Sequence, residues 1–253
     1  MDCKIVTIAN QKGGVGKTTT AINLAAGVAL LDKKVLVVDF DPQGNCGSGF
    51  GIKKDENTIY EVIMGHISTK EAMIETKVKN CSLIPANINL TGAGIELVEK
   101  EEREFFLKKV LEKERSNFDY IFIDCPPSLG ILTLNGLVAC DTVLIPLQTE
   151  FFALEGLSQL INTINLVKKS LNPDLTIEGV LLTMLDKRTH LTDDVAKNVI
   201  GHFGNKVYRT MIPRNIRIAE APSYGLPVFL HDKHCLGSKA YEELAKEFIN
   251  GKG

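Results

Sequence analysis

Short apolar runs alternate with longer segments of helical period along most of the chain. We expect strands at residues 5–9, 35–39, 82–85, 120–124, 142–146 and 177–183. Helices are expected between them, at residues 17–31, 58–64, 101–115, 131–139, 152–170, 192–203 and 238–250. Strands that are apolar on both faces and separated by helices belong in a sheet that helices cover on both sides. The order therefore predicts an α/β fold: a doubly wound, mostly parallel sheet flanked by helices.

Composition limits the organisation of this fold and its partners. The 253 residues are 44% hydrophobic and 24% charged, with no repeat and no linker-like stretch, so we expect a single domain over residues 1–253. We expect the glycine-rich residues 44–51 to form a mobile loop, and the charged residues 96–115 to form a solvated helix face. A net charge of −2 predicts no general attraction to nucleic acid or anionic lipid. Any such binding needs a local patch.

Cysteine spacing and the length of the apolar runs argue against several kinds of protein. The six cysteines, at positions 3, 46, 81, 125, 140 and 235, form no CxxC pair. This argues against a disulfide framework and against a zinc or iron–sulfur site built on that motif. The apolar runs are far shorter than the ~20 residues that cross a bilayer, and the first residues do not form a secretory signal. We expect a cytoplasmic protein with reduced thiols.

A glycine-rich segment, NQKGGVGKTT at residues 10–19, links the first expected strand to the first expected helix. Glycines let backbone N–H groups turn toward phosphate oxygens, and the helix N-terminus adds partial positive charge. Lys17 is expected to reach the β and γ phosphates of ATP, and the Thr18 hydroxyl to bind Mg²⁺. The expected nucleotide-binding residues are Lys12, Gly13, Gly14, Val15, Gly16, Lys17, Thr18 and Thr19.

The segment departs from the standard G-x-x-x-x-G-K-[ST] pattern at its start. Gln11 stands where that pattern has its first glycine, and Lys12 follows it. This form, K-G-G-x-G-K-[ST], resembles the deviant Walker A motif of the ParA/MinD class of P-loop ATPases. The resemblance implies that Lys12 crosses a dimer interface to the partner's nucleotide and acts there like an arginine finger. Without the resemblance, an exposed loop lysine is the expectation.

Carboxylates end two of the expected strands. The resemblance to the switch I motif implies that Asp41 orients or activates the attacking water, whereas Asp39 fixes the loop or the Mg²⁺ shell. Turn capping is the alternative role for both. Asp124 ends an apolar strand of Walker B form, and we expect it to bind the metal's water shell. Cys125 follows without a positioned histidine, so packing is its expected role.

A later segment, MIPRN at residues 211–215, resembles the stretch that lines the adenine in ParA/Soj proteins. The resemblance implies that Met211 and Pro213 pack on the base and that Asn215 hydrogen-bonds its edge. Residues 220–228 match the same family, and the resemblance covers residues 5–248. It implies the P-loop NTPase fold and hydrolysis of ATP to ADP and phosphate.

A basic stretch at residues 186–217 offers the local patch that the net charge does not indicate. It holds seven basic residues against three acidic ones, and such a patch binds phosphates without reading sequence. The resemblance implies that Arg188 and Arg217 contact DNA. Residues 230–237 supply only one lysine and two histidines where the family often has more basic residues. A solvated basic surface without a partner is the alternative.

The ParA/Soj resemblance implies an ATP-dependent homodimer that binds DNA non-specifically. It would be cytoplasmic and associated with the nucleoid, and it would act with a ParB/Spo0J-like partner in chromosome or plasmid partition. The alternative is a MinD- or FlhG-like spatial regulator of a protein or membrane partner. Only residues 251–253 follow the last expected helix, so we expect no membrane tethering of the MinD kind. The cysteine spacing disfavours a metal-cluster reductase.

Overall fold

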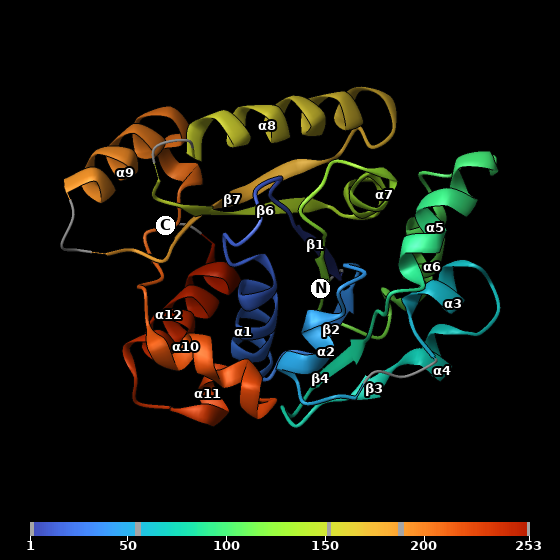
Figure 1. Ribbon diagram of the computed structural model, residues 1–253, viewed down its shortest axis with the longest axis horizontal. Helices are drawn as coiled ribbons and strands as arrows, with labels where there is room; N and C mark the ends of the chain where they lie inside the picture. Colours follow the sequence, from blue (N-terminus) through green and yellow to red (C-terminus); the bar gives the residue numbers. More distant parts are fainter. Residues whose placement is uncertain (1–2, 54–56, 151–152, 187–189, 252–253) are drawn as a thin grey trace.

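The computed structural model describes residues 3–53, 57–150, 153–186 and 190–251, and a seven-stranded sheet runs through its centre (Figure 1). The strand order is β3-β4-β2-β5-β1-β6-β7. Neighbouring strands are parallel, except that β3 and β4 pair antiparallel. The strands are β1 (Lys4–Ile8), β2 (Val35–Asp39), β3 (Ile74–Glu75), β4 (Cys81–Ile84), β5 (Tyr120–Asp124), β6 (Thr142–Gln148) and β7 (Thr176–Thr183). The prediction of a doubly wound, mostly parallel sheet is confirmed.

Helices cover both faces of the sheet (Figure 1). One layer consists of α1 (Lys17–Ala29), α2 (Asn45–Gly49), α10 (Ile216–Glu220), α11 (Val228–His231) and α12 (Leu236–Asn250). The other consists of α3 (Ile59–Ile63), α4 (Thr69–Ala72), α5 (Leu90–Glu96), α6 (Phe106–Leu111), α7 (Ile131–Ala139), α8 (Ala153–Ser170) and α9 (His190–Phe203). Short 3-10 helices are η1 (Leu97–Glu99), η2 (Glu112–Glu114), η3 (Gly204–Lys206) and η4 (Ala221–Tyr224). Each layer buries its own hydrophobic cluster against the sheet.

The register of the central strands brings the sequence motifs together. Ile121 and Ile123 of β5 face one hydrophobic cluster and Phe122 faces the other, as expected for a strand buried on both sides. Asp124 is the register partner of Ile8 on one side and of Asp39 on the other. The loop after β1 and the carboxylates of β2 and β5 therefore meet at one edge of the sheet. We call residues 10–18, Asp39, Asp41 and Asp124 the carboxyl edge.

Residues 44–51, which we expected to form a mobile loop, contain helix α2 instead. A Cβ on Gly49 would collide with Ile22 of α1. Gly51 and Gly225 approach so closely that a Cβ on either would lie within 2.7 Å of the other's backbone. The prediction was wrong because these glycines serve close packing of α2 between α1 and η4 rather than flexibility.

The helix expected at residues 101–115 is also shorter than its charge pattern indicates. Helix α6 begins only at Phe106, after turns. Asn135 of α7 sets this start, because its Oδ1 accepts from the Leu107 backbone N–H at 3.2 Å and its Nδ2 donates to the Arg103 carbonyl at 2.8 Å. A contact between distant parts of the chain thus decides where the helix begins.

The other expected helices agree with α1, α3, α7, α8, α9 and α12 to within two residues at each described end. The sequence analysis missed the short elements β3, α4, α5, α10 and α11, which are too brief to carry a recognisable period. None of the helices among the described residues combines the length and the apolar character needed to cross a membrane.

Candidate nucleotide site

The loop between β1 and α1 is held in a fixed shape by its own polar groups. Gly14 and Gly16 have φ values of 75° and 88°, in the left-handed region that residues with a Cβ avoid. Asn10 donates to a β6 carbonyl at 2.7 Å and accepts from the Lys12 backbone N–H at 3.0 Å. Lys17 Nζ donates to the Lys12 carbonyl at 3.0 Å, so the loop curls around this ammonium group. The shape is that of a phosphate-binding loop at a helix N-terminus.

Lys17 lies inside the carboxyl edge. Its side chain is only 6% exposed. Burial lowers the pKa of its ammonium group, and the carboxylates of Asp124 and Asp41 oppose that change. A buried cation at the amino end of a helix favours an anionic ligand. The Lys17 ammonium group thus lies within the glycine-rich loop, and its contact with phosphates stays a prediction.

Asp39 and Asp124 lie side by side in the core. Asp39 accepts from the backbone N–H groups of Asp41 at 3.2 Å and Cys46 at 2.9 Å. Asp124 Oδ2 accepts from the Cys46 thiol at 3.4 Å. Burial raises the pKa of Asp124 to about 7, although hydrogen bonding by the Thr18 hydroxyl opposes the rise. Burial and the neighbouring Asp124 raise the pKa of Asp39 as well.

The same cluster fits a divalent cation. Asp124 Oδ1 is fully buried and has no hydrogen-bond partner among the described residues. One ligand atom from each of Asp39, Cys46 and Asp124 lies within 4.8 Å of the others. Carboxylate and hydroxyl oxygens are the ligands that Mg²⁺ prefers. The side chains of Thr18, Asp39 and Asp124 are therefore chemically suited to hold the Mg²⁺ ion that the sequence predicts. Cys46 was not expected beside these carboxylates, because no motif marks a thiol at this place.

Asp41 is positioned by a local turn just beyond β2. Its Oδ1 accepts from the Gln43 backbone N–H at 3.0 Å, and its carbonyl accepts from the Gly44 N–H at 2.9 Å. The residue is 7% exposed. The turn-capping role that we kept as the alternative is therefore present.

Lys12 behaves differently from Lys17. It forms an ion pair with Glu150, just after β6 in the same chain, and the two side chains are 40% and 48% exposed. Its ammonium group lies at the surface, whereas only its backbone carbonyl contacts Lys17. The side chain is thus free to take part in contacts outside its own site once it leaves Glu150.

A hollow of about 340 Å³ opens beside the phosphate-binding loop. Its wall is mostly apolar and includes Gly16, Thr19, Thr183, Met184, Ile212, Pro213, Arg214, Asn215, Ile218, Ala219, Pro222 and Tyr241. Pro213 and Asn215, two of the three residues expected at the adenine, are among them. Asn215 also caps α10, because its Oδ1 accepts from the backbone N–H groups of Arg217 and Ile218. A small apolar hollow with few polar groups is typical of a ligand site.

Comparison with known proteins identifies the family. A family model described as an AAA domain matches residues 3–177. The sporulation initiation inhibitor protein Soj of Bacillus subtilis is 54% identical over 96% of this chain and 97% of its own length. The chromosome partitioning protein ParA of Caulobacter vibrioides is 51% identical over 98% of this chain and 94% of its own. The chain belongs to the ParA/Soj family of ATPases.

A solved structure supports the ParA/Soj fold. It is the Mycobacterium smegmatis protein described as cobyrinic acid a,c-diamide synthase, with a bound ATP analogue and magnesium. Its TM-score is 0.86 and its sequence identity is 37%, over 98% of this chain and 95% of that chain.

Met211, the third residue expected at the adenine, lies elsewhere in this ParA/Soj chain. It packs with the cluster on the α7 and α8 side of the sheet and borders another hollow, next to Val207 and Tyr208. A different methionine, Met184, lines the hollow beside the loop. Side chains alternate along an extended segment, so Ile212 and Met211 face opposite clusters. The sequence could not show which methionine faces the loop.

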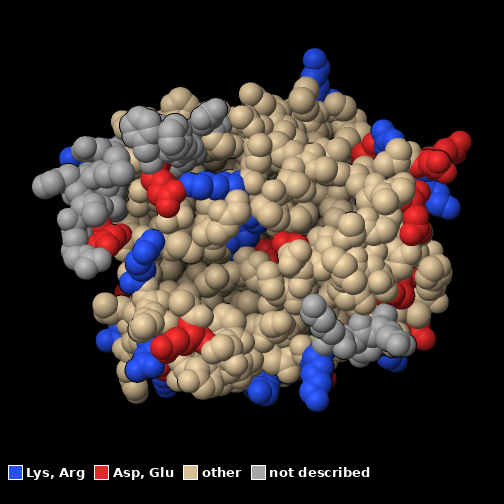
Figure 2. Space-filling model, in the orientation of Figure 1, with Lys and Arg blue, Asp and Glu red and all other residues tan. Residues whose placement is uncertain are grey.

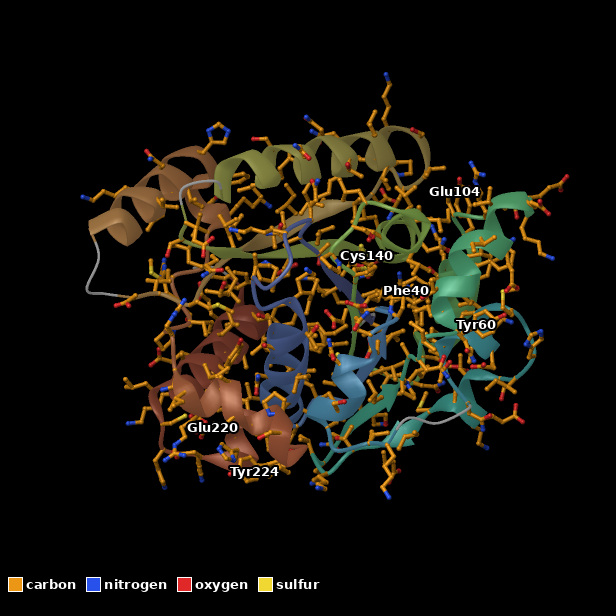
Figure 3. All side chains as sticks on the ribbon, in the orientation of Figure 1. Phe40, Tyr60, Glu104, Cys140, Glu220 and Tyr224 are labelled. Carbon is orange, nitrogen blue, oxygen red and sulfur yellow. The ribbon has the colours of Figure 1, made fainter. Side chains whose placement is uncertain are left out.

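The expected DNA-contacting residues give a mixed result. Arg188 lies outside the described residues. Arg217 is half exposed, but its guanidinium pairs with Glu220 at 3.0 Å and with Asp232 at 3.5 Å. Glu220 and Tyr224 lie together beside α10 and α11 (Figure 3), and Tyr224 stacks on His231. We call residues 215–234 the α10–α11 surface.

Charge on this side of the molecule is interspersed rather than segregated. Figure 2 shows lysine and arginine side chains next to aspartate and glutamate side chains, without a broad area of one sign on the visible face. The positive balance counted along residues 186–217 is therefore partly cancelled by carboxylates that other segments contribute.

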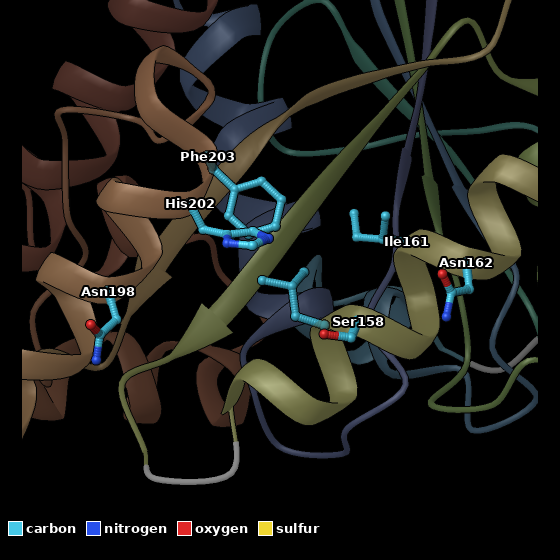
Figure 4. Close-up of a pocket in the computed structure, with 7 residues that line it drawn as sticks. Ser158, Ile161, Asn162, Asn198, His202 and Phe203 are labelled. Atoms are coloured by element: carbon cyan, nitrogen blue, oxygen red, sulfur yellow. The ribbon is translucent and has the colours of Figure 1, made fainter.

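Another hollow, of about 620 Å³, lies between α8 and α9 (Figure 4). Ser158, Ile161 and Asn162 of α8 face Asn198, His202 and Phe203 of α9. The hollow shares no lining residue with the one beside the loop. It is therefore separate from the candidate nucleotide site.

Proposed function

We propose that this ParA/Soj ATPase is an ATP-driven dimer switch that binds DNA non-specifically and acts in chromosome or plasmid partition with a ParB-like partner. The observation that carries the proposal is the contrast between the two lysines of the loop. Lys17 is buried near the carboxylates of its own site, whereas the Lys12 side chain is 40% exposed and forms an ion pair with Glu150. One loop thus supplies one cation, Lys17, for the nucleotide of its own protomer and a second cation, Lys12, for the nucleotide of the partner protomer.

Nucleotide binding follows from the loop geometry. The backbone N–H groups of residues 13–19 bind the phosphates of ATP, and Lys17 neutralises charge at the β and γ phosphates. Thr18, Asp39 and Asp124 hold Mg²⁺, which when bound supplies positive charge to the transferring phosphoryl group. Pro213 and Asn215 border the base. Asp41 orients the attacking water and accepts its proton, because its carboxylate is fixed at the mouth of the site by the Gln43 N–H.

Dimer formation brings Lys12 to the partner's nucleotide. It exchanges Glu150 for phosphate oxygens, and its charge stabilises the charge that develops during phosphoryl transfer. Two nucleotides then lie at one interface, and each protomer completes the other's site. This arrangement makes hydrolysis slow in a monomer and couples nucleotide state to assembly.

DNA binding uses the basic residues of the 186–217 stretch, including Arg188 and Arg217. One protomer offers few phosphate contacts, so its affinity falls steeply with salt, whereas two linked patches gain effective concentration. The ATP-bound dimer therefore associates with the nucleoid, and hydrolysis stimulated by a ParB-like partner releases it.

One set of measurements tests this proposal. ATP hydrolysis is measured alone, with random duplex DNA, and with DNA plus a candidate ParB-like protein, while light scattering after size exclusion reports the dimer. We expect slow turnover alone, an ATP-dependent dimer, and stimulation only when both DNA and partner are present. A chain that stays monomeric with ATP and ignores DNA refutes the switch.

A second candidate function is that of a MinD- or FlhG-like regulator with a protein or membrane partner. The pairing of Arg217 with two carboxylates favours it, because this pairing lowers the charge available to DNA. ATP-dependent gel shifts with random duplex, run beside co-sedimentation with anionic liposomes, separate the two. Retention on liposomes without a DNA shift supports the second candidate.

A further inference from the structure

Met184 stands in an unusual backbone conformation next to the phosphate-binding loop. Its φ is 53°, in the left-handed region that residues with a long side chain rarely adopt. The other described non-glycine residues with positive φ are Asp32, Asn80 and Glu102, which lie in turns. Such conformations persist only where the surroundings fix them, and they gather at functional sites.

A bulge at the end of β7 produces this conformation. Ile212 donates its backbone N–H to the Leu182 carbonyl at 2.9 Å, and its own carbonyl accepts from the Leu185 N–H at 3.0 Å. In a regular parallel ladder, one residue separates the carbonyl and the N–H that bond to the same partner residue. Here two residues, Thr183 and Met184, lie between the Leu182 carbonyl and the Leu185 N–H. Met184 is therefore the extra residue of a bulge. Pro213, which has no N–H to donate, pairs with Leu185 at the same place. Bulges of this kind redirect side chains beside active sites.

The redirected side chain lies against the start of α1. A Cβ on Gly16 would lie 3.8 Å from Met184 Cε. The preceding residue ties the bulge to the loop, since Thr183 Oγ1 donates to the Val15 carbonyl at 2.8 Å. Met184 is half-buried and lines the 340 Å³ hollow together with Pro213 and Asn215. The bulge therefore fixes a thioether side chain at the border between the phosphate loop and the hollow.

We propose that Met184 forms a wall of the base site and contacts the aromatic face of the nucleotide base. A thioether is polarizable, adapts its shape, and makes favourable contacts with aromatic rings. It has no strong donor or acceptor, so it contributes affinity for a flat ring and leaves the reading of the base edge to other groups. The strained backbone is explained by this task, because a regular ladder would aim the side chain differently.

The inference rests on ATP binding at this site and is tested by comparing ATP with inorganic triphosphate, which lacks a base. Met184→Gly suits the left-handed φ and removes the side chain, and Met184→Ala keeps a Cβ. A sulfur–aromatic contact of about 0.3–1.5 kcal/mol corresponds to an affinity change of about 2- to 10-fold. We expect both variants to bind ATP that much more weakly and to bind triphosphate as the wild-type chain does.

Met211→Ala is the matched control, because Met211 is the neighbouring methionine that faces another hollow. We expect its ratio of ATP affinity to triphosphate affinity to equal the wild-type ratio. Equal losses for both ligands in the Met184 variants, or an unchanged ratio, would overturn the inference. So would a wild-type chain that binds ATP no more tightly than triphosphate. A wild-type chain that binds neither ligand refutes the proposed function instead.

Discussion

The carboxyl edge and the α10–α11 surface hold charged groups in opposite ways. At the carboxyl edge, Lys17 and Asp39 are buried and hydrogen-bonded to backbone groups. Asp124 is buried beside them and accepts from the Cys46 thiol, and its Oδ1 has no partner among the described residues. On the α10–α11 surface, Arg217 is exposed, its two carboxylate partners are partly exposed, and the three groups already form ion pairs. Buried charges without full compensation are costly and indicate a ligand, whereas exposed pairs contribute little. The carboxyl edge is therefore suited to bind a charged ligand. On the α10–α11 surface, a ligand would have to displace the carboxylates that already pair with Arg217.

The largest effect should come from the buried cation of the carboxyl edge. Lys17→Ala removes the charge that faces the phosphates, and truncating one partner of a buried charge pair costs about 2–5 kcal/mol. We expect ATP binding, followed by calorimetry, to weaken at least ~30-fold. Lys70→Ala, at an exposed position of α4, is the control and should bind normally. Retained ATP binding in Lys17→Ala would remove the contrast between the two regions.

Asp41 tests whether the carboxyl edge separates binding from turnover. Asp41→Ala removes the group that we propose to orient the attacking water, and losing such a group costs about 10²- to 10⁴-fold in rate. ATP should still bind, so the ATP-bound dimer should accumulate in light scattering while phosphate release falls. A variant that hydrolyses ATP at the wild-type rate contradicts the role of Asp41.

Asp124 tests the cost of the unsatisfied carboxylate. A raised carboxyl pKa means that the folded state prefers the protonated form, so this group's stabilising contribution is complete at low pH and is lost as pH rises through about 7. Asp124→Asn should therefore stabilise the nucleotide-free chain at pH 8 by at least about 1 kcal/mol. Thermal melts with a chelator should show a smaller gain at pH 5, because the cost of keeping this carboxyl protonated grows as pH rises toward about 7. Equal gains at both pH values would contradict this account.

Glu150 lies at the rim, where the carboxyl edge becomes exposed. Glu150→Gln frees Lys12 without changing the size of the side chain. An exposed ion pair contributes about 0.2–1 kcal/mol, and in the proposed dimer both protomers would break this pair. The dimer dissociation constant with ATP should therefore fall about 2- to 30-fold. Glu242→Gln, which breaks an exposed pair on α12, is the control and should leave it unchanged. Weaker dimers in Glu150→Gln would indicate that the ion pair does not restrain Lys12.

The smallest effects should come from the α10–α11 surface. Glu220→Gln releases one partner of Arg217 and should tighten binding to random duplex DNA about 1.5- to 5-fold per contact. Arg217→Ala should weaken binding to unrelated sequences about equally and reduce the salt slope by roughly one unit. Filter binding over a salt series measures both. If neither variant changes the affinity for DNA, the DNA-binding patch lies elsewhere.

The carboxyl edge was predictable from sequence because its chemistry is local. Lys17 and Thr18 begin the helix that follows β1 and its glycine-rich loop, and Asp39 and Asp124 end strands whose apolar pattern gives their register. Met184 was not predictable, because its orientation depends on a bulge formed with a segment almost thirty residues later. The ion pair of Arg217 with Asp232 was not predictable either, because it joins two different segments of the chain. A count of charges along one stretch does not include the carboxylates that fold against it.

The close approach of Gly51 and Gly225 joins the two regions that this comparison separates. Gly51 lies at the end of the segment that begins with Asp41, and Gly225 lies within the α10–α11 surface. With no side chain on either residue, the two backbones meet without a compressible layer between them. A side chain at either position would have to push this segment and the end of η4 apart. The contact thus ties the end of the segment after Asp41 to the α10–α11 surface at a place where neither residue can carry a side chain.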